Sequence, residues 1–235
     1  MFSQTAQYYD AIYLAMKDYR AEAETLTAFI HRYRRSSGNR LLDVACGTGL
    51  HLSYLKQHFQ VEGLDLDEQL LAIARQRNPG IPLHHVDMTD FNLGCTFDVV
   101  TCLFSSIGYV KTLEHLSRAI QCMAQHLVPG GVLLIEPGFT PEIWRPGTVH
   151  ARFIDAPNLK IARLHTSSVD GRLSSMDMHY LIGTPEGTEH YVERNELGLF
   201  TAEEMRHALT ICGLEVTYDA TGLTGRGLYI GQHVG

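Results

Sequence analysis

Three aspartates lie at or near the ends of short apolar runs, where their carboxylates could hold a small-molecule ligand. Asp43 lies in the run Leu41-Leu42-Asp43-Val44-Ala45, Asp65 ends a second run, and Asp87 follows a third. The carboxylate of Asp43 can bind a ligand ammonium group, and that of Asp65 can accept hydrogen bonds from both hydroxyls of a ribose. The carboxylate of Asp87 can accept a hydrogen bond from the amino group of a base, with Met88 packed on the ring. Together they predict a site for a nucleoside that carries an amino-acid end.

The turn after the first apolar run contains two glycines and lacks a third. Gly47 and Gly49 flank Thr48, and Leu52 stands where a dinucleotide fingerprint G-x-G-x-x-G would place its last glycine. A pyrophosphate cradle is disfavoured for this reason, and also because Asp43 would repel the phosphates. The sequence contains no phosphate loop of the type G-x-x-x-x-G-K-[ST]. The turn therefore favours a cofactor without a diphosphate.

Parallel strands are needed to bring these residues to one edge. The run 40–45 is typical of a strand buried on both faces, and a helix from Leu50 to His58 is expected after the glycine turn. Further strands are predicted at 61–65, 81–86, 97–103 and 132–136, the last of them after the turn Leu127-Val128-Pro129-Gly130-Gly131. This alternation predicts a Rossmann-like sheet with its ligand at the carboxyl ends of the strands.

The rest of the chain is expected to form helices and strands around this core. An amphipathic helix from Tyr19 to Tyr33 is expected to cover the sheet. After Pro137 the strand and helix alternation stops, and short β-prone runs at 160–165, 176–182 and 191–193 predict a small antiparallel sheet. A helix from Thr201 to Gly213 and strands at 215–220 and 227–232 close the chain.

The predicted fold class is α/β: a Rossmann-like, doubly wound, mostly parallel seven-stranded sheet with an antiparallel β insertion acting as a substrate lid. Residues 1–148 are expected to form the N-terminal helices and the cofactor-binding core. Residues 149–200 form the insertion. Residues 201–235 form the last helix and the last two strands of the core sheet.

Composition narrows the class of protein. A formal net charge of -7 over 235 residues disfavours nucleic-acid or membrane-surface partners, since no basic stripe is present. No apolar run is long enough to span a bilayer, and the N-terminal residues do not resemble a signal peptide, so a cytoplasmic location is expected. Five cysteines and thirteen histidines show no metal-ligand spacing, and no metal is expected. Cys46 is interpreted as a small packing residue rather than a nucleophile.

At this point the residues carry a family resemblance. The segment Asp43-Val44-Ala45-Cys46-Gly47-Thr48-Gly49, the later Asp65 and Asp87-Met88, and the Pro-Gly-Gly turn together resemble class I S-adenosylmethionine-dependent methyltransferases. A narrower likeness covers nearly the whole chain and resembles the N,N-dimethyltransferases of TDP-linked 3-amino-deoxysugars, of the desosamine and mycaminose type. It is carried by Tyr9-Asp10-Ala11-Ile12-Tyr13, Lys17-Asp18-Tyr19, Phe104-Ser105-Ser106-Ile107-Gly108-Tyr109, Ile135-Glu136-Pro137 and Gly225-Arg226-Gly227-Leu228.

The resemblance implies S-adenosyl-L-methionine as cofactor and N-methylation of an amino sugar, the chemistry of antibiotic biosynthesis. It implies a cofactor site formed by Tyr13, Asp43, Ala45, Gly47, Thr48, Gly49, Asp65, Leu66, Asp87, Met88, Phe104 and Ser105. Tyr13 and Tyr109 are the expected catalytic residues, orienting the amine by hydrogen bonds, because a tyrosine with its usual pKa near ~10 is a poor base at neutral pH.

The acceptor is expected against the loop after the fourth strand and under the insertion. A nucleotide-linked sugar needs cationic partners for its diphosphate, which singles out Arg163 and Arg226, with Arg145 and Arg152 as weaker candidates. Tyr109 and His179 complete the expected acceptor site. The competing interpretation of each arginine is a solvated surface position. The competing interpretation of the insertion is that it simply caps the sheet.

Two other functions stay open from the sequence. The chain could methylate the oxygen or nitrogen of an unrelated small molecule, or it could be a non-catalytic sensor of the cofactor. The intact Asp43, Asp65, Asp87, Tyr13 and Tyr109 argue against the sensor. A homodimer is implied by the resemblance alone.

Overall fold

The computed structural model describes residues 5–234 and contains two β-sheets. The larger sheet has seven strands in the order β10-β11-β5-β4-β1-β2-β3. Its strands are β1 (Arg40–Val44), β2 (Gln60–Asp65), β3 (Leu83–His85), β4 (Phe97–Cys102), β5 (Leu127–Ile135), β10 (Leu214–Asp219) and β11 (Leu228–His233). Only β11 runs against its two neighbours in this sheet. The predicted α/β fold with a mostly parallel seven-stranded sheet is confirmed.

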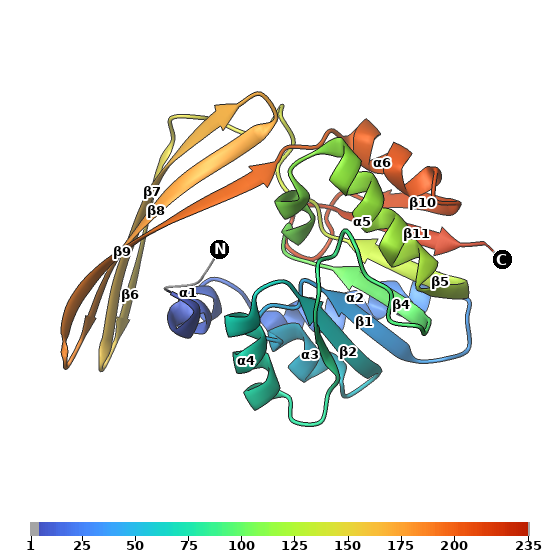
Figure 1. The fold of residues 1–235 in the computed structure, drawn as a ribbon, viewed down its shortest axis with the longest axis horizontal. Helices are drawn as coiled ribbons and strands as arrows, with labels where there is room; N and C mark the ends of the chain where they lie inside the picture. Colours follow the sequence, from blue (N-terminus) through green and yellow to red (C-terminus); the bar gives the residue numbers. More distant parts are fainter. Residues whose placement is uncertain (1–4, 235) are drawn as a thin grey trace.

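Helices cover both faces of the large sheet (Figure 1). The helices are η1 (Ala6–Tyr8), α1 (Tyr9–Leu14), α2 (Tyr19–Tyr33), α3 (Leu50–Leu55), α4 (Glu68–Arg77), η2 (Ser106–Val110), α5 (Leu113–Gln125) and α6 (Ala202–Thr210). One apolar cluster joins α2, α3 and α4 to one face, and a second joins α5 and α6 to the other. None of the helices in residues 5–234 is long and apolar enough to cross a bilayer.

Two strands of the core differ from their predicted bounds by more than one residue at an end. β5 begins at Leu127, because the segment predicted as a turn is a bulge inside the strand: the pairing with β4 jumps from Phe97–Leu127 to Val99–Val132. Gly130 in this bulge has φ +77°. β3 is shorter than predicted, since Pro82 precedes it and has no N–H to donate.

The second sheet is formed by the insertion. Its strands β6 (Val149–Ala156), β7 (Leu159–Asp170), β8 (Leu173–Thr184) and β9 (Gly187–Gly198) pair in sequence order as antiparallel hairpins. They are longer than the predicted runs, and β6 was not predicted.

The insertion sheet is joined to the core through the N-terminal helix. Figure 1 shows α1 between the two sheets. Ile12 and Tyr13 of α1 pack in one apolar cluster with Leu50 and Leu70 of the core and with Tyr180 of β8. This arrangement leaves a cavity at the carboxyl ends of the core strands.

Candidate active site

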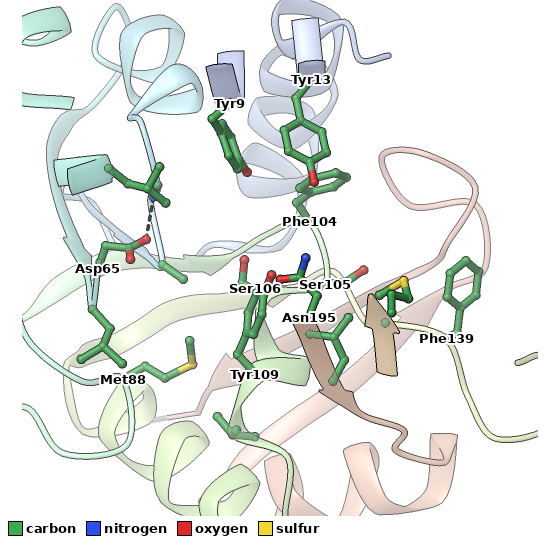
Figure 2. Close-up of a pocket in the computed structure, with 18 of the residues that line it drawn as sticks. Tyr9, Tyr13, Asp65, Met88, Phe104, Ser105, Ser106, Tyr109, Phe139 and Asn195 are labelled. Atoms are coloured by element: carbon green, nitrogen blue, oxygen red, sulfur yellow. Dashed lines mark hydrogen bonds between the residues drawn. The ribbon is translucent and has the colours of Figure 1, made fainter. Parts of the chain in front are cut away.

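One cavity of about 320 Å³ lies between the core strands and the insertion sheet (Figure 2). It is lined at one end by residues at the end of β2 and after β3, including Asp65 and Met88. At the other end it is lined by residues of the insertion, including Arg163 and Asn195. The cavity therefore connects the predicted cofactor and acceptor sites.

Asp65 is tied to the glycine turn. Its Oδ2 accepts a hydrogen bond from the Gly47 N–H at 2.8 Å, and its Oδ1 accepts one from the Asp67 N–H at 2.8 Å. Burial raises the pKa of Asp65, while the backbone hydrogen bonds oppose that rise. The remaining acceptor capacity of this carboxylate faces the cavity, as a ribose diol requires.

The two glycines of the turn have different roles. Gly47 has φ +56° and lines the cavity, and a Cβ built on it would meet nothing within 4 Å. Gly49 has φ +69°, begins α3 and backs onto α4, where a Cβ would lie 2.7 Å from Asn78 Nδ2. Gly49 lines neither this cavity nor the smaller one beside it. The structure thus gives Gly49 a role in shaping the turn, in place of the predicted ligand contact.

Asp43 lines a smaller cavity that shares Ala45 and Gly47 with the large one. Its side chain is 2% exposed, and Oδ1 accepts a hydrogen bond from Thr101 Oγ1 at 2.8 Å. Burial raises the pKa of Asp43 to about 6, so the group is mostly ionised at neutral pH. A buried carboxylate beside an open cavity suits a ligand ammonium group.

Thr48 lines the same small cavity and connects the turn to the N-terminal helix. Its Oγ1 donates to Asp10 Oδ1 at 2.7 Å. Arg77 of α4 donates to both the Thr48 carbonyl and the Asp10 carboxylate. These bonds hold α1 over the glycine turn.

The predicted base-binding residues lie together at the far end of the large cavity. Leu66, Asp87 and Met88 all line it. Asp87 is exposed, and its Oδ1 accepts from the backbone N–H and the hydroxyl of Thr89, each at 2.8 Å. Leu66 is 53% exposed, which leaves its side chain free to pack on a planar ring.

The loop after β4 forms the middle of the cavity. Phe104 and Ser105 both have positive φ, 53° and 62°, and the Phe104 N–H donates to the buried Glu136 Oε2 at 2.7 Å. This strained turn exposes Phe104, Ser105 and Tyr109 to the cavity. Tyr13 reaches the same space from α1 and contacts the Phe104 ring edge-on, with centroids 5.2 Å apart.

Both predicted catalytic tyrosines stay protonated at physiological pH. Burial raises the pKa of Tyr13, and the guanidinium of Arg163 opposes that rise. Burial also raises the pKa of Tyr109, well beyond the usual value for tyrosine. Their hydroxyls can donate and accept hydrogen bonds, but they do not supply a phenolate base.

Two of the four candidate arginines line the cavity. Arg163 is 5% exposed and lies over the Tyr13 ring at 5.7 Å. Arg226 is exposed, donates to Ser105 Oγ at 2.9 Å and lies over the rings of Phe104 and Phe139. Arg145 instead donates to nearby backbone carbonyls, and Arg152 is exposed on the edge strand β6.

His179 lies outside the cavity. Alternation along β8 turns Met178 and Tyr180 toward the core and His179 to the opposite, exposed face, where its Nδ1 is 3.2 Å from His190 Nε2. This placement corrects the predicted acceptor contact. The sequence reasoning missed Asn195, which lines the cavity from β9. The sequence marks Asn195 only by its alternation with Glu193 and Leu197, which places the three residues on one face of a strand.

Known proteins resemble this chain along nearly its whole length. A family model described as a methyltransferase domain matches residues 41–131. The chain is 42% identical over 231 residues to the dTDP-3-amino-3,6-dideoxy-α-D-glucopyranose N,N-dimethyltransferase of Streptomyces fradiae, which covers 97% of this chain and 90% of the relative. This chain belongs to the dTDP-amino-deoxysugar N,N-dimethyltransferase family. It is therefore a class I S-adenosylmethionine-dependent methyltransferase.

Other proteins of this kind are similar to the chain in sequence and in structure. The dTDP-4-amino-2,3,4,6-tetradeoxy-D-glucose N,N-dimethyltransferase of Saccharopolyspora spinosa is 39% identical, covering 96% of this chain and 91% of the relative. The crystal structure of Streptomyces venezuelae DesVI superposes with a TM-score of 0.92 at 39% identity, covering 96% and 97% of the two chains. The amino pentose methyltransferase CalS10 of Micromonospora echinaspora, solved with the cofactor bound, gives 0.88 at 38% identity, covering 96% of each chain.

The residues of this methyltransferase fit S-adenosylmethionine. The open space over Gly47 would be filled by a Cβ, the buried Asp43 can hold the amino-acid end, and Asp65 can hold the ribose. When bound, the cofactor supplies a methyl group activated by its sulfonium, with sulfur as the leaving group.

Proposed function

We propose that this methyltransferase methylates the amino group of a TDP-linked amino-deoxysugar, with the 3-amino group as the favoured position. The observation that carries the proposal is the distribution of charge in the large cavity. Its acids, Asp65 and Asp87, lie at the cofactor end, and its arginines, Arg163 and Arg226, line the other part. Guanidinium groups are suited to a diphosphate, which a nucleotide-linked sugar carries and a simple amine lacks.

In this proposal the protein acts by positioning. The acceptor amine must arrive unprotonated, since only its lone pair can attack the methyl carbon. Tyr13 and Tyr109 can accept an N–H of the amine and so direct that lone pair. Alignment of this kind contributes roughly 7–11 kcal/mol to rate enhancement in favourable cases. A dedicated base is not required, because the proton of the methylated amine can leave to water.

The insertion sheet acts as the lid in the same proposal. Its residues line the cavity opposite the core strands, and α1 lies between the two sheets (Figure 1). Exclusion of water protects the activated methyl group from wasteful reaction and strengthens hydrogen bonds to the amine.

The test is methyl transfer from labelled cofactor to a panel of acceptors. The panel contains TDP-linked 3-amino and 4-amino deoxysugars, the matching hydroxyl sugars, and simple amines and phenols. Labelled product from the 3-amino sugar supports the proposal, and mass spectrometry counts the methyl groups added. Product from simple amines or phenols alone would overturn the sugar assignment, and cofactor binding without any product would favour a sensor.

The remaining assignments concern assembly and location. The outer face of the insertion sheet exposes Val149, Phe153, Leu164, Leu181 and Val192. We propose that this face pairs two copies of the chain, and light scattering with a Phe153→Asp variant tests it. All five cysteines are free thiols, in keeping with the proposed cytoplasmic location, which cell fractionation tests.

A further inference from the structure

Asn195 has an unsatisfied acceptor that faces the cavity. Its side chain is 2% exposed, its Nδ2 lies 3.2 Å from the sulfur of Met178, and its Oδ1 has no partner within the protein. A reversed amide would set the oxygen against sulfur, and both atoms are electron-rich, so the orientation with Oδ1 free is favoured. A buried acceptor without a donor is unfavourable, and it indicates a place for a ligand donor.

Such groups are rare around the cavity. Among residues 5–234, only Arg163 and Asn195 line it with buried side-chain atoms that lack a partner. Nε and Nη1 of Arg163 are donors, and Oδ1 of Asn195 is an acceptor. The two residues lie on β7 and β9 and face the same side of the insertion sheet. A ligand that offers a hydrogen-bond donor to Asn195 and an acceptor or anion to Arg163 would satisfy both residues.

Asn195 lies close to the loop after β4. The strand β9 packs on η2, where a Cβ at Gly108 would lie 3.2 Å from Leu197 Cβ. Leu197 shares a face of β9 with Asn195, and Tyr109 is carried by η2. Figure 2 shows the Asn195 side chain pointing into the cavity near Tyr109. The Asn195 side chain thus lies beside the part of the cavity assigned to the reacting amine.

We propose that Asn195 Oδ1 accepts a hydrogen bond from the N–H of the acceptor amine and so directs its lone pair toward the methyl group. This inference rests on the proposed function. A neutral amine keeps its lone pair when an N–H is held by an amide oxygen. A carboxylate in this position would instead stabilise the ammonium form, which has no lone pair. In the transfer a nitrogen–carbon bond forms, the carbon–sulfur bond breaks with its electrons on sulfur, and the nitrogen then loses one proton to water.

The decisive variant is Asn195→Asp, which preserves the shape of the side chain and adds a charge. Other titratable or charged groups toward this part of the cavity are Tyr9, Tyr13, Tyr109, His115, Arg163 and Arg226. We expect the acidic limb of the pH profile of kcat, which reports ionisation of the bound amine, to move up by about one pH unit or more, because the new charge favours the ammonium form. Activity at neutral pH falls and recovers in alkaline buffer.

Asn195→Ala removes the acceptor without adding charge. It is expected to lower kcat/KM about 10- to 100-fold at every pH and to leave the acidic limb of the kcat profile in place. Asn158→Ala, in the exposed turn between β6 and β7, is the matched control and should leave kcat/KM unchanged. Thermal unfolding and the dissociation constant for S-adenosylhomocysteine check that each variant is folded.

An unshifted acidic limb in Asn195→Asp would overturn the inference, since Asn195 would then face a hydroxyl rather than the amine. Failure of the proposed function gives a different result, namely no product from any nucleotide-linked amino sugar with the unmodified enzyme. If another amine is methylated, the same variants are measured with that amine. If no amine is methylated, the role of Asn195 is overturned as well.

Discussion

The carboxylate of Asp65 and the backbone N–H of Gly47 form a hydrogen bond of 2.8 Å that joins the end of β2 to the turn after β1. The two residues are 18 positions apart. One side chain therefore fixes the glycine turn and also faces the space where the ribose is expected. Loss of this carboxylate should affect both the turn and the ligand.

Asp65→Ala is expected to weaken binding of S-adenosylhomocysteine about 10- to 100-fold, corresponding to about 1–3 kcal/mol for the unpaired hydroxyl and N–H groups. Isothermal titration calorimetry measures the dissociation constant. Asp90→Ala, at an exposed position, serves as control. An Asp65→Ala protein that binds as tightly as the unmodified one would contradict the ribose assignment.

Gly47→Ala should separate folding from binding. Gly47 and Gly171 both have φ +56°, and a Cβ on either would meet nothing within 4 Å, but only Gly47 lines the cavity. Alanine at either position is expected to cost about 1 kcal/mol of stability from the left-handed backbone. Only Gly47→Ala should also weaken cofactor binding, because its methyl group occupies ligand space. Equal thermal shifts with equal affinities would show that the turn does not touch the cofactor.

Asp43 should make stability depend on pH. Its pKa is about 6 in the folded protein and near 3.8 when exposed. In the window between these two pH values, the folded state therefore retains a proton that the unfolded state has lost. Stability therefore falls as pH rises through the window and levels off above it. In Asp43→Asn this loss is absent, while Oδ1 can still accept from Thr101.

Urea unfolding across this pH range measures the effect. The free energy of unfolding of Asp43→Asn, relative to that of the unmodified protein, is expected to grow with pH to an excess of about 3 kcal/mol. Each unit of pKa shift contributes about 1.4 kcal/mol. Parallel stability profiles for the two proteins would mean that burial does not penalise the Asp43 charge.

Arg226→Ala should raise the KM for the nucleotide sugar and leave cofactor affinity unchanged. The Arg226 guanidinium is exposed, donates to Ser105 and lies beside two aromatic rings, so it can bind phosphate without serving the core. A loss of about 1–3 kcal/mol in acceptor binding is expected. Arg20→Ala, on the exposed surface of α2, is the control. Weakened cofactor binding with an unchanged KM would place Arg226 at the wrong end of the cavity.

The core could be predicted because its signals are local. The alternation of buried strands and amphipathic helices, with acids at strand ends, identifies parallel strands and the edge where they meet. Other features depend on distant parts of the fold. The bulge at Gly130 is set by pairing with β4, and the left-handed backbone of Phe104 and Ser105 is held in part by Glu136, which accepts the Phe104 N–H.

The insertion was harder to predict because both of its faces carry apolar residues. Leu164, Leu181 and Val192 face outward, whereas Met178 and Tyr180 face the cavity side. Periodicity alone therefore could not show which phase of β8 meets the ligand, and His179 was assigned to the wrong face. Asn195 had only its phase with Glu193 and Leu197 to mark it in the sequence, whereas the unpaired state of its oxygen marks it in the fold.

The chain leaves the core after β5, forms the entire second sheet and then returns as α6, so the strands proposed to meet the acceptor occupy one uninterrupted stretch, 149–198. The residues assigned to the cofactor precede that stretch. Mutations that change the choice of sugar can accumulate in this stretch while the methyl-donating half stays intact. Substitutions confined to this stretch are therefore expected to change the choice of acceptor more than the affinity for the cofactor.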